Sequence, residues 1–304
     1  MIKLLGRFVG SLVAASVVIF VLLRIVPGDP ARVALGTTAT DAAVAKLAAQ
    51  LGTDRPLIVQ YFSWIGGLLR GNFGTSLATR KNITPLALDR MQVSAILCGV
   101  TMALTLLIAV PLGMYAARRR SAVVDIVTQI GVAVPSFLVA ILLVAAFMGV
   151  LPANGWVPPN QGFGAFVEHL ILPVISLTLV QTAIMTRYVR GEIFGVMHMD
   201  HIRTARSLGL SWRQALTRHG LRLAAVPILT IAGLQLTSLI VGAVVIERVF
   251  VIPGLGSMLL DAVSNRDLTT VQSIVMLLVF VTLTVNLVVD VLARVIDPRM
   301  KEER

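Results

Sequence analysis

The stretch VSAILCGVTMALTLLIAVPLGMYAA, residues 93–117, contains no charged side chain and is followed at once by Arg118, Arg119 and Arg120. About 20 consecutive apolar residues are enough for a helix to cross the hydrocarbon core of a bilayer, so this stretch predicts a membrane-spanning helix. Lys and Arg residues beside a span are typical of its cytoplasmic end. We therefore expect the chain to cross a membrane here and to leave the three arginines in the cytoplasm.

Five further stretches have comparable length and apolarity, which predicts an all-α integral membrane protein with six transmembrane helices. The composition supports this class, because 57% of the 304 residues are hydrophobic and only 13% are charged. A soluble domain carries roughly 25% charged residues. The single cysteine, Cys98, excludes a disulfide framework. The further stretches cover residues 4–26, 126–151, 170–190, 223–246 and 268–289.

The first apolar stretch also has features of a secretory signal peptide, because Lys3 and Arg7 precede its uncharged part. However, Arg24 and Pro27 stand where a cleavage site needs small residues, and the later stretches require a membrane in any case. We therefore interpret residues 1–26 as an N-terminal transmembrane helix.

The distribution of Lys and Arg predicts the orientation of the chain. Arginines are frequent after the second span and between the fourth and fifth spans, whereas residues 152–169 contain no Lys or Arg. This pattern places both termini in the cytoplasm. Residues 27–91 fall outside despite seven basic residues, because the rule loses force in connections longer than about 60 residues. Topology thus explains the net charge of +11, and we expect no nucleic-acid partner.

The sequence contains no motif for catalysis or for a cofactor. None of the four lysines follows a glycine, so the phosphate-binding loop of an ATPase is missing. His198 and His201 stand near Asp200 without a further ligand set, so we expect no metal site. The middles of the spans lack the ionisable residues of many ion-coupled carriers. We expect no catalytic residue, no metal and no cofactor.

The segment DHIRTARSLGLSWRQALTRHG, residues 200–220, predicts two short helices joined by a turn. Asp200 can cap the first helix, Gly209 can end it, and Ser211 with Gln214 matches a capping box for the second. Attachment to the membrane at both ends argues against a DNA-reading role. The pair is suited to docking into a groove of a cytoplasmic partner. A merely solvated basic loop is the alternative.

This segment resembles the EAA loop of permease subunits of ATP-binding-cassette importers, in the variant of the dipeptide and oligopeptide branch. Arg203 and Thr204 replace the Glu and the first Ala of the general pattern, whereas Ala205 and Gly209 match it. The branch pattern RTAR-x-x-G is present in full, and Pro227 follows at the spacing of the branch.

Further blocks along nearly the whole chain resemble the first (B-type) permease subunit of peptide importers. Asn72, Leu268 and Thr269 depart locally from the common residues of that subunit. The similar blocks are RIVPGDP at 24–30, residues 51–77, VIERVFVIPGLG at 245–256, and the later RDLTTVQ, NLVVDVL and IDPR.

The resemblance implies a type I importer permease fold in a bacterial cytoplasmic (inner) membrane. It divides the chain into the first helix, an extracytoplasmic region (27–91), a five-helix permease core (92–296) with a cytoplasmic coupling loop (187–222), and a cytoplasmic tail (297–304). The implied partners are a homologous second permease, two cytoplasmic ATPases, an extracytoplasmic binding protein, a peptide substrate and membrane lipid. The implied ATPase-coupling residues are Arg203, Thr204, Ala205 and Gly209, and we extend this role to Asp200 and Arg206.

Uncharged polar residues inside the spans are candidates for lining the transport path. Thr178 with Gln181, and Gln235 with Ser238, are spaced three apart, so each pair shares a helix face. Hydrogen bonding between helices is the alternative role. Pro135 interrupts the third span and is a candidate for gating.

The outer region predicts a helix at 41–51 that ends at Gly52, followed by an amphipathic run after Pro56. Tyr61, Phe62 and Trp64 suit the membrane interface. The region can lie on the membrane or meet the binding protein.

Nickel, glutathione or another small solute is the alternative cargo, and a self-contained channel or secondary carrier is the alternative class.

Overall fold

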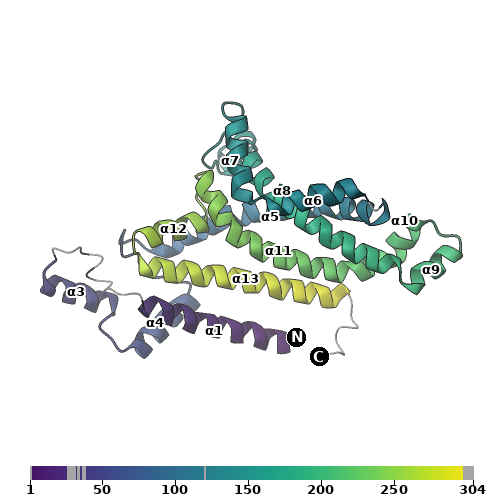
Figure 1. The fold of residues 1–304 in the computed structure, drawn as a ribbon. Coiled ribbons are helices and arrows are strands. Elements are labelled where there is room, and N and C mark those ends of the chain that lie inside the picture. Colours follow the sequence, from purple (N-terminus) through teal and green to yellow (C-terminus); the bar gives the residue numbers. More distant parts are fainter. Residues whose placement is uncertain (1, 26–31, 33–34, 36–38, 120, 297–304) are drawn as a thin grey trace. The chain divides into compact units, whose positions relative to one another are not determined.

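The computed structural model describes residues 2–25, 32, 35, 39–119 and 121–296, and these residues form helices and their connections (Figure 1). The predicted tail 297–304 and residues 26–30 of the first block lie outside this part. The longer helices are α1 (Ile2–Ile25), α5 (Ile83–Arg119), α8 (Phe163–Met197), α11 (Leu221–Val249) and α13 (Leu268–Ile296). The shorter ones are α3 (Asp41–Leu51), α4 (Leu57–Leu69), α6 (Ala122–Ala133), α7 (Ser136–Phe147), α9 (Asp200–Ser207), α10 (Trp212–Ala215) and α12 (Leu255–Ser264).

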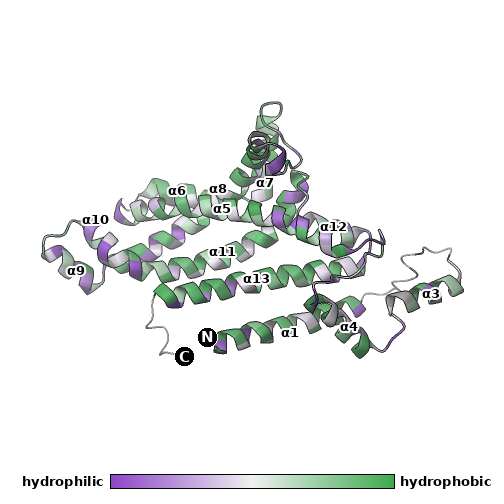
Figure 2. Ribbon diagram, turned by 180° about the vertical axis from the view of Figure 1, so that it is seen from behind, coloured by the Kyte–Doolittle hydropathy of each residue, from purple (hydrophilic) through white to green (hydrophobic). Residues whose placement is uncertain are grey.

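The five longer helices are long and apolar enough to cross a membrane, and the prediction of an all-α membrane protein is confirmed. In Figure 2 they are coloured mainly as hydrophobic, whereas hydrophilic residues gather around α9 and α10. A span must satisfy its own backbone hydrogen bonds in lipid, and a continuous helix does so.

The third predicted span, 126–151, is not one helix. It consists of α6 and α7, which are bent by 95° at the break between them. Val134 is extended (φ −91°, ψ 122°) and Pro135 precedes α7. Proline disfavours helical backbone in the residue before it and has no N–H to donate, so the helix stops here. The described residues therefore contain five candidate spans, or six if the bent pair counts as one.

The chain forms two compact units, and α5 and α13 each contribute a part to both. The first unit contains residues up to Ser94 and the segment Pro253–Leu283. The predicted helix 41–51 is α3, and Gly52 ends it in a left-handed conformation (φ +68°). The amphipathic run after Pro56 is α4. Both predictions for the outer region are confirmed.

Two of the three aromatic residues expected at the membrane interface pack against α1. The rings of Tyr61 and Trp64 lie 5.4 and 6.2 Å from that of Phe20, and the Tyr61 hydroxyl lies 2.8 Å from Ser16 Oγ. Packing these rings against α1 buries apolar area that α4 could not bury by itself. Phe62 remains exposed.

A buried carboxylate fixes the loop before α5 to the start of α13. Asp267, which is 3% exposed, accepts hydrogen bonds from Ser76 Oγ (2.5 Å) and the Leu77 N–H (3.1 Å). It also accepts from the N–H (3.2 Å) and Oγ1 (2.7 Å) of Thr270, and thereby caps α13. Ser273 Oγ donates to the carbonyl of Phe73 at 2.6 Å, which reinforces the junction.

The second unit, formed by Ala95–Ile252 with residues 284–304, packs its helices closely against α8. A Cβ added to Gly113 of α5 would lie 2.7 Å from Val189 Cβ, and one on Gly131 of α6 would lie 2.6 Å from Ala183 Cβ. Small residues permit such approach of membrane helices, where dispersion contacts rather than the hydrophobic effect hold helices together.

We predict that Gly113→Ala destabilises the protein by about 1–3 kcal/mol, because the new methyl group overlaps Val189 in a packed interface. Gly99→Ala is the matched control on the same helix, since a Cβ there meets no atom within 4 Å. Thermal unfolding in detergent should show a lower midpoint for Gly113→Ala only. An equal midpoint for both variants would refute the packing argument.

Candidate functional site

The connection between α8 and α11 is shorter than predicted, because α8 continues to Met197. The next helix, α9, begins at Asp200, and its N-cap is Met199, which makes no side-chain capping bond. The prediction that Asp200 caps this helix is therefore wrong by one position. As the first helical residue, Asp200 interacts favourably with the helix dipole. It also pairs with Arg203 at 3.6 Å.

The other two local predictions for this segment are confirmed. Gly209 follows α9 in a left-handed conformation (φ +94°), which a side chain disfavours. Its N–H donates to the Arg206 carbonyl at 3.0 Å. Ser211 and Gln214 form a reciprocal capping box, in which the Ser211 N–H donates to Gln214 Oε1 (3.0 Å) and the Gln214 N–H donates to Ser211 Oγ (3.3 Å).

The second predicted helix is not an independent element. Its regular part, α10, covers four residues and continues through a π-helical turn at Leu216–Gly220 into α11. Ala215 and Leu216 are buried, so the turn packs inward. Displacement of this segment would therefore act directly on the fifth predicted span.

Helix α9 has one buried and one exposed face. Ile202 and Ala205, at 2% and 7% exposure, pack in one cluster with Ile193 and Val196 of α8 and with Leu216. The structure thus places Ala205 against its own chain, where its small size lets α9 lie close to α8. The outward face carries Asp200, Arg203, Thr204, Arg206, Leu208 and Gly209.

The outward face is basic with an apolar tip. Arg203 and Arg206 are both exposed, and Leu208 is 80% exposed at the end of the helix. An apolar side chain flanked by cations is suited to a groove that offers an apolar pocket beside carboxylate or carbonyl oxygens. Of the six coupling residues expected from the sequence, the structure brings five to this face.

Sequence reasoning missed two arginine contacts, of which the first braces this segment. The Arg118 guanidinium lies over the Trp212 ring, 5.3 Å from its centroid, and connects the end of α5 with α10. Arg190 of α8 forms an ion pair with Asp125 of α6. A tryptophan in a basic loop close to an arginine run was the available signal for the first contact.

The residues predicted to line the path differ in burial. Thr178 and Gln181 are buried on α8, Gln235 is half-buried on α11, and Ser238 is exposed. Sequence reasoning missed four buried or half-buried threonines whose hydroxyls, like Thr178 Oγ1, have no hydrogen-bond partner in the described part of the chain. These are Thr101 and Thr105 of α5 and Thr182 and Thr186 of α8.

Two further observations concern buried charge and metal binding. Glu247, one residue beyond the predicted fifth span, is 1% exposed in the last turn of α11, so one buried carboxylate stands at the end of this helix. Among the described residues, no group of three or more His, Cys, Asp and Glu could hold a metal ion. His198 Nδ1 lies 2.7 Å from the carbonyl of Phe194 on its own helix.

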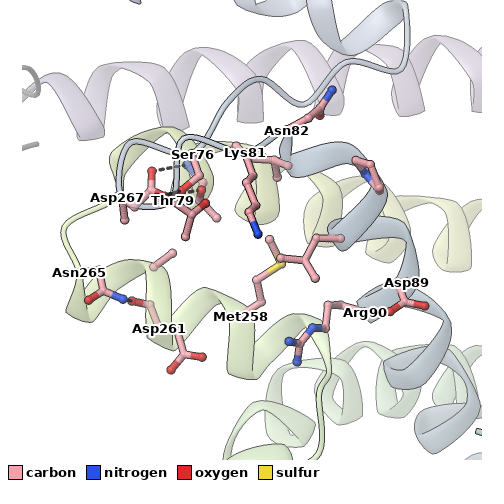
Figure 3. A pocket seen from close by; sticks show the side chains of 16 residues that line it. Ser76, Thr79, Lys81, Asn82, Asp89, Arg90, Met258, Asp261, Asn265 and Asp267 are labelled. Atoms are coloured by element: carbon pink, nitrogen blue, oxygen red, sulfur yellow. Dashed lines mark hydrogen bonds between the residues drawn. The ribbon is translucent and has the colours of Figure 1, made fainter. Parts of the chain in front are cut away.

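A pocket of about 950 Å³ lies in the first unit between the loop before α5, the start of α5, and α12. Lys81 extends into it, and Arg90, Asp89 and Asp261 add both signs of charge to its lining (Figure 3). These residues lie in the first and last external connections predicted from the sequence.

Comparison with known proteins adds independent information. Residues 95–302 match the family "Binding-protein-dependent transport system inner membrane component", and residues 1–98 match its N-terminal model. A probable peptide ABC transporter permease protein of Sinorhizobium fredii is 36% identical over 99% of both chains. An oligopeptide transport system permease protein of Bacillus subtilis is 32% identical over 95% of both chains.

Two further similarities extend this result. A glutathione transport system permease protein of Salmonella choleraesuis is 35% identical over 98% of this chain and 97% of its own. A crystal structure of an amino acid ABC transporter with histidines matches with a TM-score of 0.53 and 18% identity. That match covers 69% of this chain and 94% of the other, and it shows a shared fold.

We predict that Ala205→Glu releases α9 from its core, because a carboxylate cannot stay buried there unpaired. Trypsin cleavage after Arg203 and Arg206 should then accelerate by roughly tenfold or more. Thr204→Glu is the matched control, since this neighbour is exposed. Mass spectrometry of the fragments measures both rates, and equal rates would contradict the assigned faces of α9.

Proposed function

The chain belongs to the family of inner membrane components of binding-protein-dependent transport systems, and we propose that it is the permease subunit of an ATP-driven peptide importer whose α9 contacts a partner ATPase. The observation that carries the coupling assignment is the division of α9 into two faces. Ile202 and Ala205 hold the helix to its own core, while Arg203, Arg206 and Leu208 face outward.

The family has several consequences for this chain. It is a multi-pass component of an inner membrane, it is not itself catalytic, and it works with an ATPase and a binding protein. We extend this to a complex with a homologous second permease and two cytoplasmic ATPases. In this arrangement both termini and α9 are cytoplasmic, as the placement of Lys and Arg predicts.

The charge of α9 suits an ATPase surface that offers carboxylate or carbonyl oxygens. Arginine guanidinium groups bind carboxylates through paired, charge-assisted hydrogen bonds, and Leu208 adds apolar contact area between them. Because α9 packs on α8 and α10 leads into α11, a movement of the ATPase surface reaches two spans directly.

Peptide is the cargo supported by the relatives. Two of the relatives above are named for peptide or oligopeptide transport, and the third for glutathione, which is itself a short peptide. The polar side chains inside the second unit are mainly hydroxyls and amides. Such groups hold a zwitterionic peptide weakly, which suits a route that passes cargo on after the binding protein has selected it.

We predict that the double variant Arg203→Glu, Arg206→Glu retains the ATPase at roughly one tenth of the wild-type level or less when the complex is purified, since two charge-assisted contacts become repulsive. The matched control, Lys46→Glu with Arg70→Glu, reverses two exposed charges in the outer region. Quantitative mass spectrometry of co-purified subunits is the measurement. Full ATPase retention by the first double variant would rule out the docking face.

We predict that Gly209→Asp inserts normally into the membrane but abolishes transport, because the left-handed backbone at this position strains any side chain. Gly191→Asp is the control, since Gly191 lies in α8 with no positive φ and no atom within 4 Å of an added Cβ. Uptake of a labelled oligopeptide by cells measures transport, and immunoblotting of membranes measures insertion. Normal uptake by Gly209→Asp would refute the assignment.

The cargo is tested separately by reconstituting the complex with its binding protein in liposomes. Labelled oligopeptide, glutathione and nickel are offered in parallel, with and without ATP. We expect ATP-dependent accumulation of the oligopeptide. Accumulation of glutathione or nickel alone would reassign the cargo and leave the permease function in place.

A further inference from the structure

A second pocket in the first unit, about 410 Å³ in volume, lies where α1 ends. It is bounded by the last turn of α1, the turn between α3 and α4, one side of α4, the loop at 72–77 and the first turns of α13. The polar residues that matter for its chemistry are Arg24, Arg55, Gln60, Trp64 and Gln272.

Three buried polar atoms of this lining have no partner in the part of the chain that the structure describes. They are Trp64 Nε1, Gln272 Nε2 and Gln60 Oε1. The Gln60 amide nitrogen is already engaged, since it donates to the carbonyls of Thr53 (3.0 Å) and Arg55 (2.6 Å). Buried donors are nearly always satisfied in native structures, so the indole and amide N–H groups indicate a ligand that brings acceptors.

The pocket is also positive. Arg24 and Arg55 both contribute to its lining, and its described residues include no Asp or Glu. Arg24 is held in place over the Phe20 ring, 5.0 Å from the centroid. Two guanidinium groups together with unpaired N–H donors are the chemistry that recognises a phosphate or carboxylate.

The position of the pocket favours the phosphate of a membrane lipid over other phosphates and carboxylates. The 24 residues of α1 span about 36 Å, so Arg24 in the last turn lies at the level of the lipid headgroups. Val17, Val18, Val21 and Leu22 are exposed along α1 beside the pocket and offer an apolar surface to acyl chains. Trp64 suits the same interfacial level.

From these observations we propose that the pocket binds the phosphodiester headgroup of an anionic phospholipid. Arg24 and Arg55 neutralise the phosphate, and Trp64 and Gln272 donate to its oxygens or to the glycerol hydroxyls. A lipid held there would connect α1 with α4 and α13 through one ligand. The proposal depends on the chain crossing a membrane and not on its cargo.

The full-length chain, purified in detergent with the subunits that accompany it, is titrated with phosphatidylglycerol and with phosphatidylcholine of the same acyl chains, and bound lipid is counted by native mass spectrometry. Wild type should prefer phosphatidylglycerol. Arg24→Gln with Arg55→Gln should weaken that binding by roughly thirtyfold, at about one order of magnitude or less per arginine. Equal binding of the two lipids by wild type would overturn the proposal.

Controls separate charge, fold and ligand source. Lys46→Gln with Arg70→Gln removes two exposed charges outside the pocket and should bind like wild type. Arg24→Lys with Arg55→Lys keeps the charge and should retain most of the phosphatidylglycerol binding. If this variant loses binding and also elutes at a changed volume, the site is misfolded, and the result counts against the assignment. In the last control, inorganic phosphate is added as a competitor. If phosphate at millimolar concentration displaces phosphatidylglycerol, the pocket is a free-anion site and the lipid assignment is overturned.

Discussion

Close packing against α8 is the constraint on which the second unit depends. Lipid provides little hydrophobic force between helices, so the association rests on contact distance. Gly113 and Gly131 allow α5 and α6 to approach α8 until no methyl group would fit between them. Further along α8, Ile193 and Val196 are buried against α9. One helix therefore fixes both the bundle and the orientation of the face assigned to the ATPase.

This arrangement explains how a short helix can transmit movement. An eight-residue helix has little stability of its own, because nucleation of an isolated helix is unfavourable. Ile202 and Ala205 supply the missing stability by joining the core of the unit. The Arg118 contact with Trp212 braces the following turn, which continues into α11 without a loop. Force applied to Arg203 or Arg206 by the proposed ATPase contact would thus be carried by packed side chains.

Sequence reasoning succeeded where a local signal decides the structure and failed where a tertiary contact does. Apolar length predicted the spans, and the Ser211 capping box and Gly209 were found because their hydrogen bonds are local. Pro135 was recognised as an interruption of the third span, but the 95° bend into two helices was not predicted, since many proline-containing membrane helices stay continuous. Ala205 was assigned to coupling by resemblance, but only the structure shows that it faces its own core. The unpartnered threonines recur four residues apart on α5 and α8, a local signal that was available but not used. The pocket beside Arg24 joins distant segments and leaves no local pattern.

The placement of charge follows from the cost of ions in lipid. A charged side chain at the bilayer centre is unfavourable by several kcal/mol, so fixed charge belongs at the ends of spans. The basic face of α9 lies at one such end of α8, and Arg24 lies in the last turn of α1. Glu247 sits near the end of α11, although it is buried. Recognition by charge is therefore available to partners and lipids at the membrane surfaces, whereas cargo on the proposed route would meet mainly hydroxyl and amide groups. A permease with the proposed route would have little means of selecting cargo by charge, so a separate protein would have to select it.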